Sequence, residues 1–312
     1  NQIAAGEVIE RPASVIKELV ENSLDAATTE IDVTIEGSGS QLIQVRDNGS
    51  GIHPDDLCLA LSRHATSKIS SSDQLSQISS LGFRGEALPS ISSVSNLSLI
   101  SRQHDSECGW QIHFETDMPE PVPHPKGTTV AVRDLFFNLP ARRRFLRSAR
   151  TEQQQILTTL QRLALSRFDV RFQCNLNGQQ KLNLPIAQTD AQQLARIGKI
   201  CGQTFVKQAL VIDQQFDVIN IKGWLGHTEA HRPQADQQYF FINGRVIRDR
   251  LISQVIRQAY ADLIPAGRHP AYVLYMTIPL DRVDINVHPT KHEVRFRETR
   301  LIHGLIHRAI SD

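Results

Sequence analysis

The stretch Val15-Ile16-Lys17-Glu18-Leu19-Val20-Glu21-Asn22-Ser23-Leu24-Asp25-Ala26 decides how the rest of the chain is interpreted. Its apolar residues recur at helical spacing and predict an amphipathic helix that begins near Ser14. Its polar residues fall at positions i, i+3, i+4 and i+7 and form a stripe on the opposite side of that helix. The stripe consists of Glu18, Glu21, Asn22 and Asp25.

A polar stripe of this kind is most often a solvated helix face. Two features favour a binding site instead. Glu21 and Asp25 are like charges four residues apart, which costs an isolated helix a few tenths of a kcal/mol. Glu18 is followed one turn later by Asn22 rather than by a lysine or arginine. We therefore interpret the stripe as carboxylates and a carboxamide that are held together without cations, to receive a metal cation and a water.

A second polar element follows the strand-like residues 42–45 and reads Arg46-Asp47-Asn48-Gly49-Ser50-Gly51. The two glycines allow the backbone to turn tightly and to approach a ligand. For this segment alone, an ordinary Asp-Asn-Gly turn between strands is the simpler interpretation.

Four motifs in this order resemble those of the GHKL ATPases, the superfamily that joins gyrase B, heat-shock chaperones, histidine kinases and MutL. They are Glu18-x-x-Glu21-Asn22-x-x-Asp25-Ala26, Asp47-x-Gly49-x-Gly51, Gly82-Phe83-Arg84-Gly85-Glu86-Ala87-Leu88 and Gly127-Thr128-Thr129. Residues 1–13, 82–88 and 286–296 are similar to the MutL family specifically. The resemblance covers nearly the whole chain and is to the N-terminal ATPase fragment of bacterial MutL, a mismatch repair family.

The composition is that of an ordinary globular protein: 312 residues, 40% hydrophobic and 21% charged, long enough for two domains. No apolar run approaches the ~20 residues of a membrane span, and no secretory signal is visible. The four cysteines lack Cys-x-x-Cys spacing, which is typical of reduced thiols in a cytoplasm. The first residue is not Met, so further residues are expected to precede it. A net charge of +1 means that any nucleic-acid binding must come from local patches.

We predict an α+β fold with a boundary near residue 203. Residues 1–203 are expected to form a GHKL-type sandwich, a mixed sheet with helices on one face. Residues 204–312 resemble the ribosomal-S5-like second domain of MutL, topoisomerase and chaperone relatives, with a crossover helix at 247–261. Residues 1–8 are expected to be helical, and the four-proline segment 118–126 is expected to cross the surface without regular structure.

Residues 62–80 form a long, serine-rich polar segment, and Gly82-x-Arg84-Gly85 closes it. Such a segment in a compact domain is either disordered or a functional lid. The glycine turn favours a lid, because exposed backbone N–H groups and the start of the following helix can hold phosphates.

ATP hydrolysis requires positioning and charge neutralisation. Glu18 is the candidate general base, and Asn22 is the candidate protein ligand of Mg²⁺. The resemblance supports both roles and assigns the adenine amino group to Asp47, an acceptor-only carboxylate that guanine, with a carbonyl at that edge, would not satisfy. Lys291 of the second domain is implied to reach back to the γ-phosphate. The other nucleotide contacts implied are Asp25, Asn48, Gly51, Thr66, Ser67, Lys68, Gly82, Arg84, Gly85 and one or both of Thr128 and Thr129.

Two other nucleotide folds are disfavoured. The chain has no Gly-x4-Gly-Lys-Ser/Thr pattern of a P-loop. Gly49 and Gly51 lack the third glycine of a dinucleotide-binding fingerprint.

DNA is the second predicted ligand. Four arginines lie on or beside the predicted helix 247–261, and the resemblance implies a basic groove there in the dimer, with salt-sensitive phosphate contacts. They are Arg245, Arg248, Arg250 and Arg257. A further arginine-rich segment, 142–150, is equally compatible with a solvated face and with a phosphate-facing role.

The favoured function is a slow ATPase whose nucleotide state controls homodimerisation, DNA binding and recruitment in mismatch repair. The partners expected are a mismatch-recognition protein and a downstream endonuclease or helicase, in a bacterial cytoplasm near the nucleoid and without a membrane. One alternative is an ATP-gated binding module in which hydrolysis is incidental. Another is a chaperone or topoisomerase ATPase, which residues 1–13 and 82–88 disfavour. No nuclease site is visible in the sequence.

Overall fold

The computed structural model describes residues 9–62, 85–113, 118–284 and 294–311. The predicted helix 1–8 lies outside these ranges. The chain divides into two compact units, 1–164 with 168–187 and 165–167 with 188–312. The boundary therefore lies earlier than residue 203, because α7 (Asp190–Cys201) belongs to the second unit. There α7 packs against α8 (Gln203–Lys207), and Gln237 Nε2 donates a hydrogen bond to the Cys201 carbonyl oxygen at 2.9 Å.

The first unit is built on an eight-stranded mixed sheet in the order β5-β4-β3-β6-β2-β1-β7-β8. Neighbouring strands are antiparallel except for β1 and β7, which are parallel. The strands are β1 (Glu30–Glu36), β2 (Leu42–Asp47), β3 (Asn96–Arg102), β4 (Gly109–His113), β5 (Glu120–Val122), β6 (Gly127–Arg133), β7 (Arg171–Leu176) and β8 (Gln179–Leu184).

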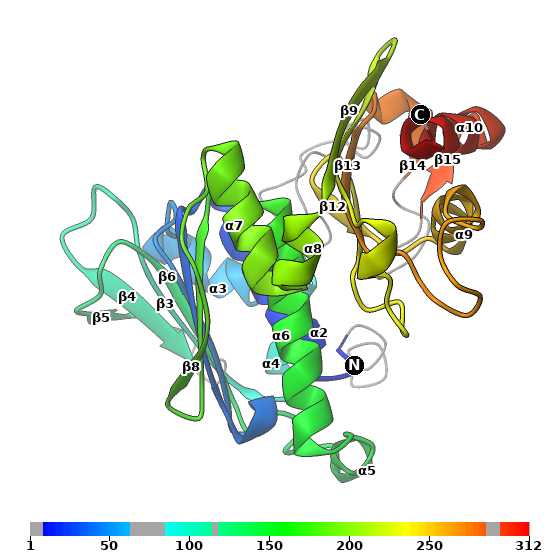
Figure 1. Ribbon diagram of the computed structural model, residues 1–312. Coiled ribbons are helices and arrows are strands. Elements are labelled where there is room, and N and C mark those ends of the chain that lie inside the picture. The colour runs from blue at the N-terminus through cyan, green and yellow to red at the C-terminus, as the bar shows by residue number, and fades with distance from the viewer. Residues whose placement is uncertain (1–8, 63–84, 114–117, 285–293, 312) are drawn as a thin grey trace. The chain divides into compact units, whose positions relative to one another are not determined.

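Helices cover one face of this sheet. In Figure 1, α2 (Pro12–Asp25), α4 (Ala87–Ser92) and α6 (Ala149–Ser166) lie on the same side of its strands. Smaller elements connect them: η1 (Gly37–Gly39), η2 (Pro54–Asp56), α3 (Leu57–Ala60) and α5 (Pro140–Arg144). The predicted α+β class and the helices on one face of a mixed sheet are confirmed.

Alternation of apolar and polar residues explains why the strands pack under α2. On β1, Ile31, Val33 and Ile35 are buried while the residues between them are not. The apolar face of α2 is buried as well, including Ile16 and Leu19. Burying each side chain of this size contributes roughly 1.5–3 kcal/mol, so this face holds α2 against the sheet.

The second unit contains a five-stranded sheet in the order β12-β11-β13-β10-β9. Strands β11 and β13 are parallel, and α9 (Arg250–Ala259) lies in the connection between them. A second helix, α10 (Thr299–Ser311), packs against α9. The remaining elements are β9 (Leu210–Phe216), β10 (Ile219–Leu225), η4 (Thr228–Ala230), β11 (Gln238–Ile242), β12 (Arg245–Ile247), β13 (Tyr272–Thr277), η5 (Leu280–Arg282), β14 (Val283–Asp284) and β15 (Arg295–Phe296).

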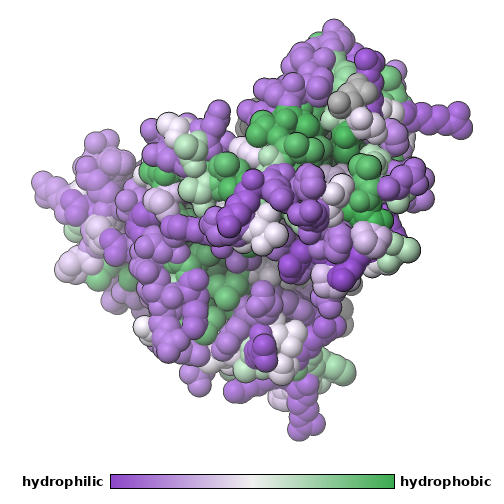
Figure 2. All heavy atoms as spheres, viewed as in Figure 1, coloured by the Kyte–Doolittle hydropathy of each residue, from purple (hydrophilic) through white to green (hydrophobic). Residues whose placement is uncertain are grey.

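Apolar side chains reach the surface on β9, an edge strand of this sheet, where Leu210 and Val211 are exposed. Figure 2 shows apolar atoms at the surface in the part of the second unit where Figure 1 places β9 and β13. In the parts of the chain that the structure describes, no helix is long and apolar enough to cross a membrane.

Several short elements differ from the sequence prediction. Residues 118–126 contain a strand, β5, because residues 120–122 pair with β4 at the edge of the sheet, where Pro121 needs no ladder hydrogen bond. The predicted helix 247–261 begins later, at Arg250, because Asp249 caps it with side-chain hydrogen bonds to the N–H groups of Leu251 and Ile252. Residues 245–247 instead form β12, which was not predicted, and neither was α10.

Two glycines with left-handed backbone conformations provide a test of local packing. Gly127 begins β6 with φ of 110°, and a Cβ there would collide with the carbonyl oxygen of Asp47. Gly178 has φ of 77° in the β7–β8 hairpin, and nothing lies near its Cβ position. We expect Gly178→Ala to cost about 1 kcal/mol of unfolding free energy, from backbone strain alone. Gly127→Ala should cost at least about 2 kcal/mol more, because β2 and β6 must separate.

Urea denaturation of both variants measures this difference. Equal losses for the two variants would show that the close approach of β6 to Asp47 does not limit the fold.

Candidate active site

A row of polar side chains crosses three adjacent strands at one end of the first sheet. Asp47 of β2 lies opposite Thr128 of β6, and Thr128 lies opposite Ser101 of β3. Directly paired residues on neighbouring strands point to the same face of a sheet. All three residues are buried, and Ser101 is completely inaccessible to solvent. The three side chains therefore form one continuous polar row.

Asp47 is held by three hydrogen-bond donors. Ser23 Oγ of α2 donates to Oδ2 at 2.7 Å, and the backbone N–H groups of Gly49 and Thr128 donate to Oδ1 at 2.9 and 3.2 Å. Burial raises the pKa of Asp47, and these hydrogen bonds offset part of that rise. An ionised carboxylate has about four acceptor positions, so Oδ2 keeps one for a ligand N–H group.

The structure separates the two candidate threonines. Thr128 Oγ1 lies 2.8 Å from Ser101 Oγ, in the same row as Asp47. Thr129 lies on the opposite face, where its Oγ1 is 2.8 Å from Nε2 of His124. Burial lowers the pKa of His124, which favours its neutral ring. Thr128 is thus the threonine that stands beside Asp47.

Gly51 and Ser101 fix the loop that follows Asp47. Gly51 has φ of 73°, and a Cβ there would collide with the carbonyl oxygen of Arg102. The next residue, Ile52, donates its N–H to Ser101 Oγ at 2.8 Å. Sequence analysis missed Ser101, although it occupies a buried position of β3 in line with Leu97 and Leu99. A serine in such an apolar alternation is a detectable signal.

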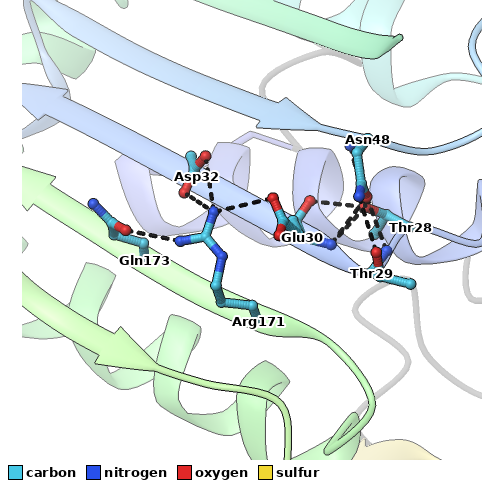
Figure 3. A network of polar contacts seen from close by, with 7 residues as sticks. All are labelled: Thr28, Thr29, Glu30, Asp32, Asn48, Arg171 and Gln173. Atoms are coloured by element: carbon cyan, nitrogen blue, oxygen red, sulfur yellow. Dashed lines mark hydrogen bonds and ion pairs between the residues drawn. The ribbon is translucent and has the colours of Figure 1, made fainter.

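Asn48 anchors the same loop to the connection between α2 and β1 (Figure 3). Its Oδ1 accepts from Thr28 Oγ1 at 2.6 Å and from the N–H groups of Thr29 and Glu30 at 2.9 and 3.0 Å. Its Nδ2 donates to Thr29 Oγ1 at 2.9 Å. The amide group is thus used within the protein, and the nucleotide contact expected of Asn48 is not available to its oxygen.

Arg171 extends this network across the sheet. Its guanidinium contacts Glu30 and Asp32 of β1, with Nη2–oxygen distances of 3.3 and 3.0 Å, and it donates to Gln173 (Figure 3). The start of β1 is therefore tied to β7.

The polar stripe of α2 is not free of cations, contrary to the expectation from the sequence. Lys17 Nζ lies 3.3 Å from Glu18 Oε1 and 3.1 Å from Glu21 Oε1. Burial alone would lower the pKa of Lys17, but Glu21 and then Glu18 outweigh it and the pKa is raised. The expectation rested on the turn that follows Glu18, whereas Lys17 precedes Glu18 and lies at i−4 from Glu21. Asn22 and Asp25 are partly buried.

The predicted phosphate side of the site is described only in part. Gly85 has φ of 61° just before α4. Thr66, Ser67, Lys68, Gly82, Arg84 and Lys291 lie outside the described residues. Within the described ranges, no group of three His, Cys, Asp or Glu side chains could hold a metal ion.

The predicted DNA-contacting arginines do not share one environment. Arg245 is buried on β12 rather than exposed beside the helix, so its guanidinium is not available at the surface. Arg250 and Arg257 are exposed at the two ends of α9, and Arg248 is exposed before it. In the other arginine-rich segment, Arg142 donates to the carbonyl oxygen of Ile9 at 3.0 Å and has a structural role.

Comparisons with known proteins agree with this architecture. Residues 9–122 match the family model described as "Histidine kinase-, DNA gyrase B-, and HSP90-like ATPase". Residues 197–312 match "DNA mismatch repair protein, C-terminal domain". Fold and site together define an ATPase domain of the GHKL class followed by a mismatch-repair-type domain.

The chain belongs to the MutL family of DNA mismatch repair proteins. It is 52% identical to MutL of Cellvibrio japonicus over 99% of its length, and 52% identical to MutL of Pseudomonas fluorescens over its whole length. It spans about half of these relatives, 50% and 51%. The Aquifex aeolicus MutL ATPase domain complexed with ADP is 31% identical, covering 87% of this chain and 93% of that one with a TM-score of 0.64. The N-terminal domain of a DNA repair protein, at 24% identity and a TM-score of 0.82, shares the fold over 100% of this chain and 96% of that one.

The burial of Asp47 predicts a pH-dependent stability. Because the folded-state pKa is raised, ionisation of Asp47 costs the folded state stability, and this cost appears as pH rises from the ordinary Asp value of about 4 through the folded pKa. Asp47→Asn removes the charge and retains the shape. We expect this variant to be more stable than the wild type at pH 7, with the difference shrinking as the pH falls towards about 4.

Thermal unfolding midpoints across this pH range test the prediction. Asp105→Asn, at an exposed position, is the matched control and should show no such trend. A wild-type advantage at pH 7 would contradict the prediction.

Proposed function

We propose that this chain is the ATP-driven switch of a mismatch repair protein. In this proposal, ATP binding and slow hydrolysis control homodimerisation, DNA binding and the recruitment of repair partners. The observation that carries it is the buried Asp47 carboxylate beside Thr128, with one acceptor position open, in a chain of the MutL family. The ADP bound by the Aquifex aeolicus ATPase domain supports a nucleotide ligand here.

The polar row suits adenine. Its exocyclic amino group can donate to Asp47 Oδ2, and Thr128 provides a hydroxyl beside it. Guanine presents a carbonyl at that edge and would face the carboxylate with an unsatisfied acceptor. GTP should therefore bind more weakly than ATP.

The polar stripe of α2 suits the hydrolytic step. Glu18 is the proposed general base for the water that attacks the γ-phosphorus, yielding ADP and phosphate. Glu18 and Asn22 are four residues apart and therefore share a face of α2, and Asn22, next to the Asp47 partner Ser23, is the proposed protein ligand of Mg²⁺. Bound Mg²⁺ would neutralise charge on the phosphate oxygens. Asp25 is proposed to support the same site from the end of the helix.

The phosphates are assigned to groups that the family resemblance supports. These are Thr66, Ser67, Lys68, Gly82, Arg84 and Gly85, together with Lys291 as the group that distinguishes ATP from ADP. A lysine contact to the γ-phosphate would exist only with ATP bound, so it would couple nucleotide state to the second unit.

The second unit is proposed to bind the DNA backbone through Arg248, Arg250 and Arg257, with little sequence preference. A mismatch-recognition protein and a downstream endonuclease or helicase are the proposed partners, and the bacterial cytoplasm is the proposed location.

One observation favours the alternative of an ATP-gated binding module. Lys17 Nζ already holds Glu18 at 3.3 Å, and a carboxylate engaged with an ammonium group is less available as a base. In that alternative ATP closes the site and hydrolysis is incidental.

Replacing the proposed base separates the two functions. Glu18→Gln should lower ATP turnover by about 10²–10⁴-fold, because the attacking water loses its proton acceptor. Affinity for ATP should stay within about threefold, since the base acts in the transition state. Light scattering should show that the variant remains dimeric with ATP for longer than the wild type. Glu36→Gln, the same change at an exposed position of β1, is the control. Unchanged turnover in Glu18→Gln would favour the binding module.

The DNA assignment predicts a salt-dependent weakening of binding. Arg250→Glu with Arg257→Glu should weaken binding to duplex DNA of any sequence, and the slope of log affinity against log salt should decrease by about 1 for each arginine–phosphate interaction that the substitutions remove. Lys181→Glu, at an exposed position of β8 in the first unit, controls for net charge. DNA binding by the double variant equal to that of Lys181→Glu at low salt would refute the assignment.

A further inference from the structure

Ser101 lies at the inner end of the polar row and makes three contacts through one hydroxyl group. Its Oγ accepts the Ile52 N–H at 2.8 Å, donates to the Gly127 carbonyl oxygen at 3.2 Å, and lies 2.8 Å from Thr128 Oγ1, where either oxygen can be the donor. The side chain is completely buried. No solvent molecule can therefore take over one of these hydrogen bonds.

A proton count limits what this hydroxyl can do. Serine has one hydrogen and two acceptor positions, and the Ile52 N–H fills one acceptor position. If Ser101 donates to Gly127, Thr128 must donate to Ser101, and Thr128 then offers only acceptor positions to a ligand. If Ser101 donates to Thr128 instead, it gives up the longer contact to Gly127, and the Thr128 hydrogen becomes available to a ligand.

The second arrangement matches one class of purine. An amino group next to a ring nitrogen, as in adenine, needs one acceptor and one adjacent donor. Asp47 supplies the acceptor, and Thr128 supplies the donor when Ser101 donates to it. A 6-oxopurine has the reverse pattern, with a carbonyl next to a ring N–H.

We propose that Ser101 is a positioning and specificity-determining residue, which sets the hydrogen-bond polarity of Thr128 and thereby favours 6-aminopurine over 6-oxopurine nucleotides. This inference rests on the proposed function, since it requires the purine to lie at Asp47. Without the Ser101 hydroxyl, Thr128 loses the partner that orients it and can turn to donate or to accept, so discrimination falls.

The experiment measures base selectivity rather than catalysis. Calorimetry gives the dissociation constants of the non-hydrolysable β,γ-imido analogues of ATP and of inosine triphosphate, and their ratio is compared between variants. Ser101→Ala should reduce the preference for the adenine analogue by about tenfold, as expected for the loss of one oriented buried hydrogen bond. Thr128→Val, which removes the hydroxyl that Ser101 orients, should reduce it similarly, and Ser101→Ala added to Thr128→Val should reduce it no further.

A matched control separates selectivity from stability. Ser95 is also buried, and its Oγ donates to the Ile91 carbonyl oxygen at 2.6 Å, away from the row. Ser95→Ala should lower the melting temperature without changing the ratio. Because Ser101→Ala can also destabilise the fold, Thr128→Val provides an independent arm.

Two failures are distinguishable. A wild-type protein that binds both analogues equally would refute the placement of adenine at Asp47 and with it the proposed function. A selective wild type whose ratio is unchanged in Ser101→Ala or in Thr128→Val would overturn the role of Ser101 alone.

Discussion

The buried carboxylate of Asp47 imposes the constraint on which the first unit depends. A carboxylate removed from water is costly unless several donors satisfy it. Here the donors come from three places: Ser23 on α2, Gly49 in the following loop and Thr128 on β6. The same hydrogen bonds therefore hold the helix, the loop and the strand in register, and they leave one acceptor position for a ligand.

The surroundings of Asp47 follow from this constraint. Gly127 must lack a side chain because β6 approaches the Asp47 carbonyl, and Gly51 must lack one because its loop lies against Arg102. Asn48 consumes its amide on residues 28–30 and thereby fixes the loop from the other side. A raised pKa at Asp47 is the remaining cost, and sites that trade stability for binding commonly carry such a cost.

Glu18 and Lys17 show that a functional helix face can also be internally neutralised. The lysine contacts two carboxylates of the stripe, so charge balance exists before any metal ion arrives. In the second unit, the capping of α9 by Asp249 separates Arg245, buried on a strand, from Arg250 and Arg257 on the helix. A short run of arginines in the sequence thus becomes two different environments.

Local sequence determined much of this protein: the amphipathic α2, the alternating strands, the mixed α+β class and the motifs that identify the family. These features depend on periodicity and on residue spacing, which the chain carries in order. It did not determine which threonine stands beside Asp47, because adjacent strand residues point to opposite faces and only the pairing with Asp47 chooses between Thr128 and Thr129. The role of Ser101, the use of the Asn48 amide and the pairing of Lys17 were likewise decided by tertiary structure, because each depends on contacts in the folded chain, across strands or around a helix, that linear spacing does not specify.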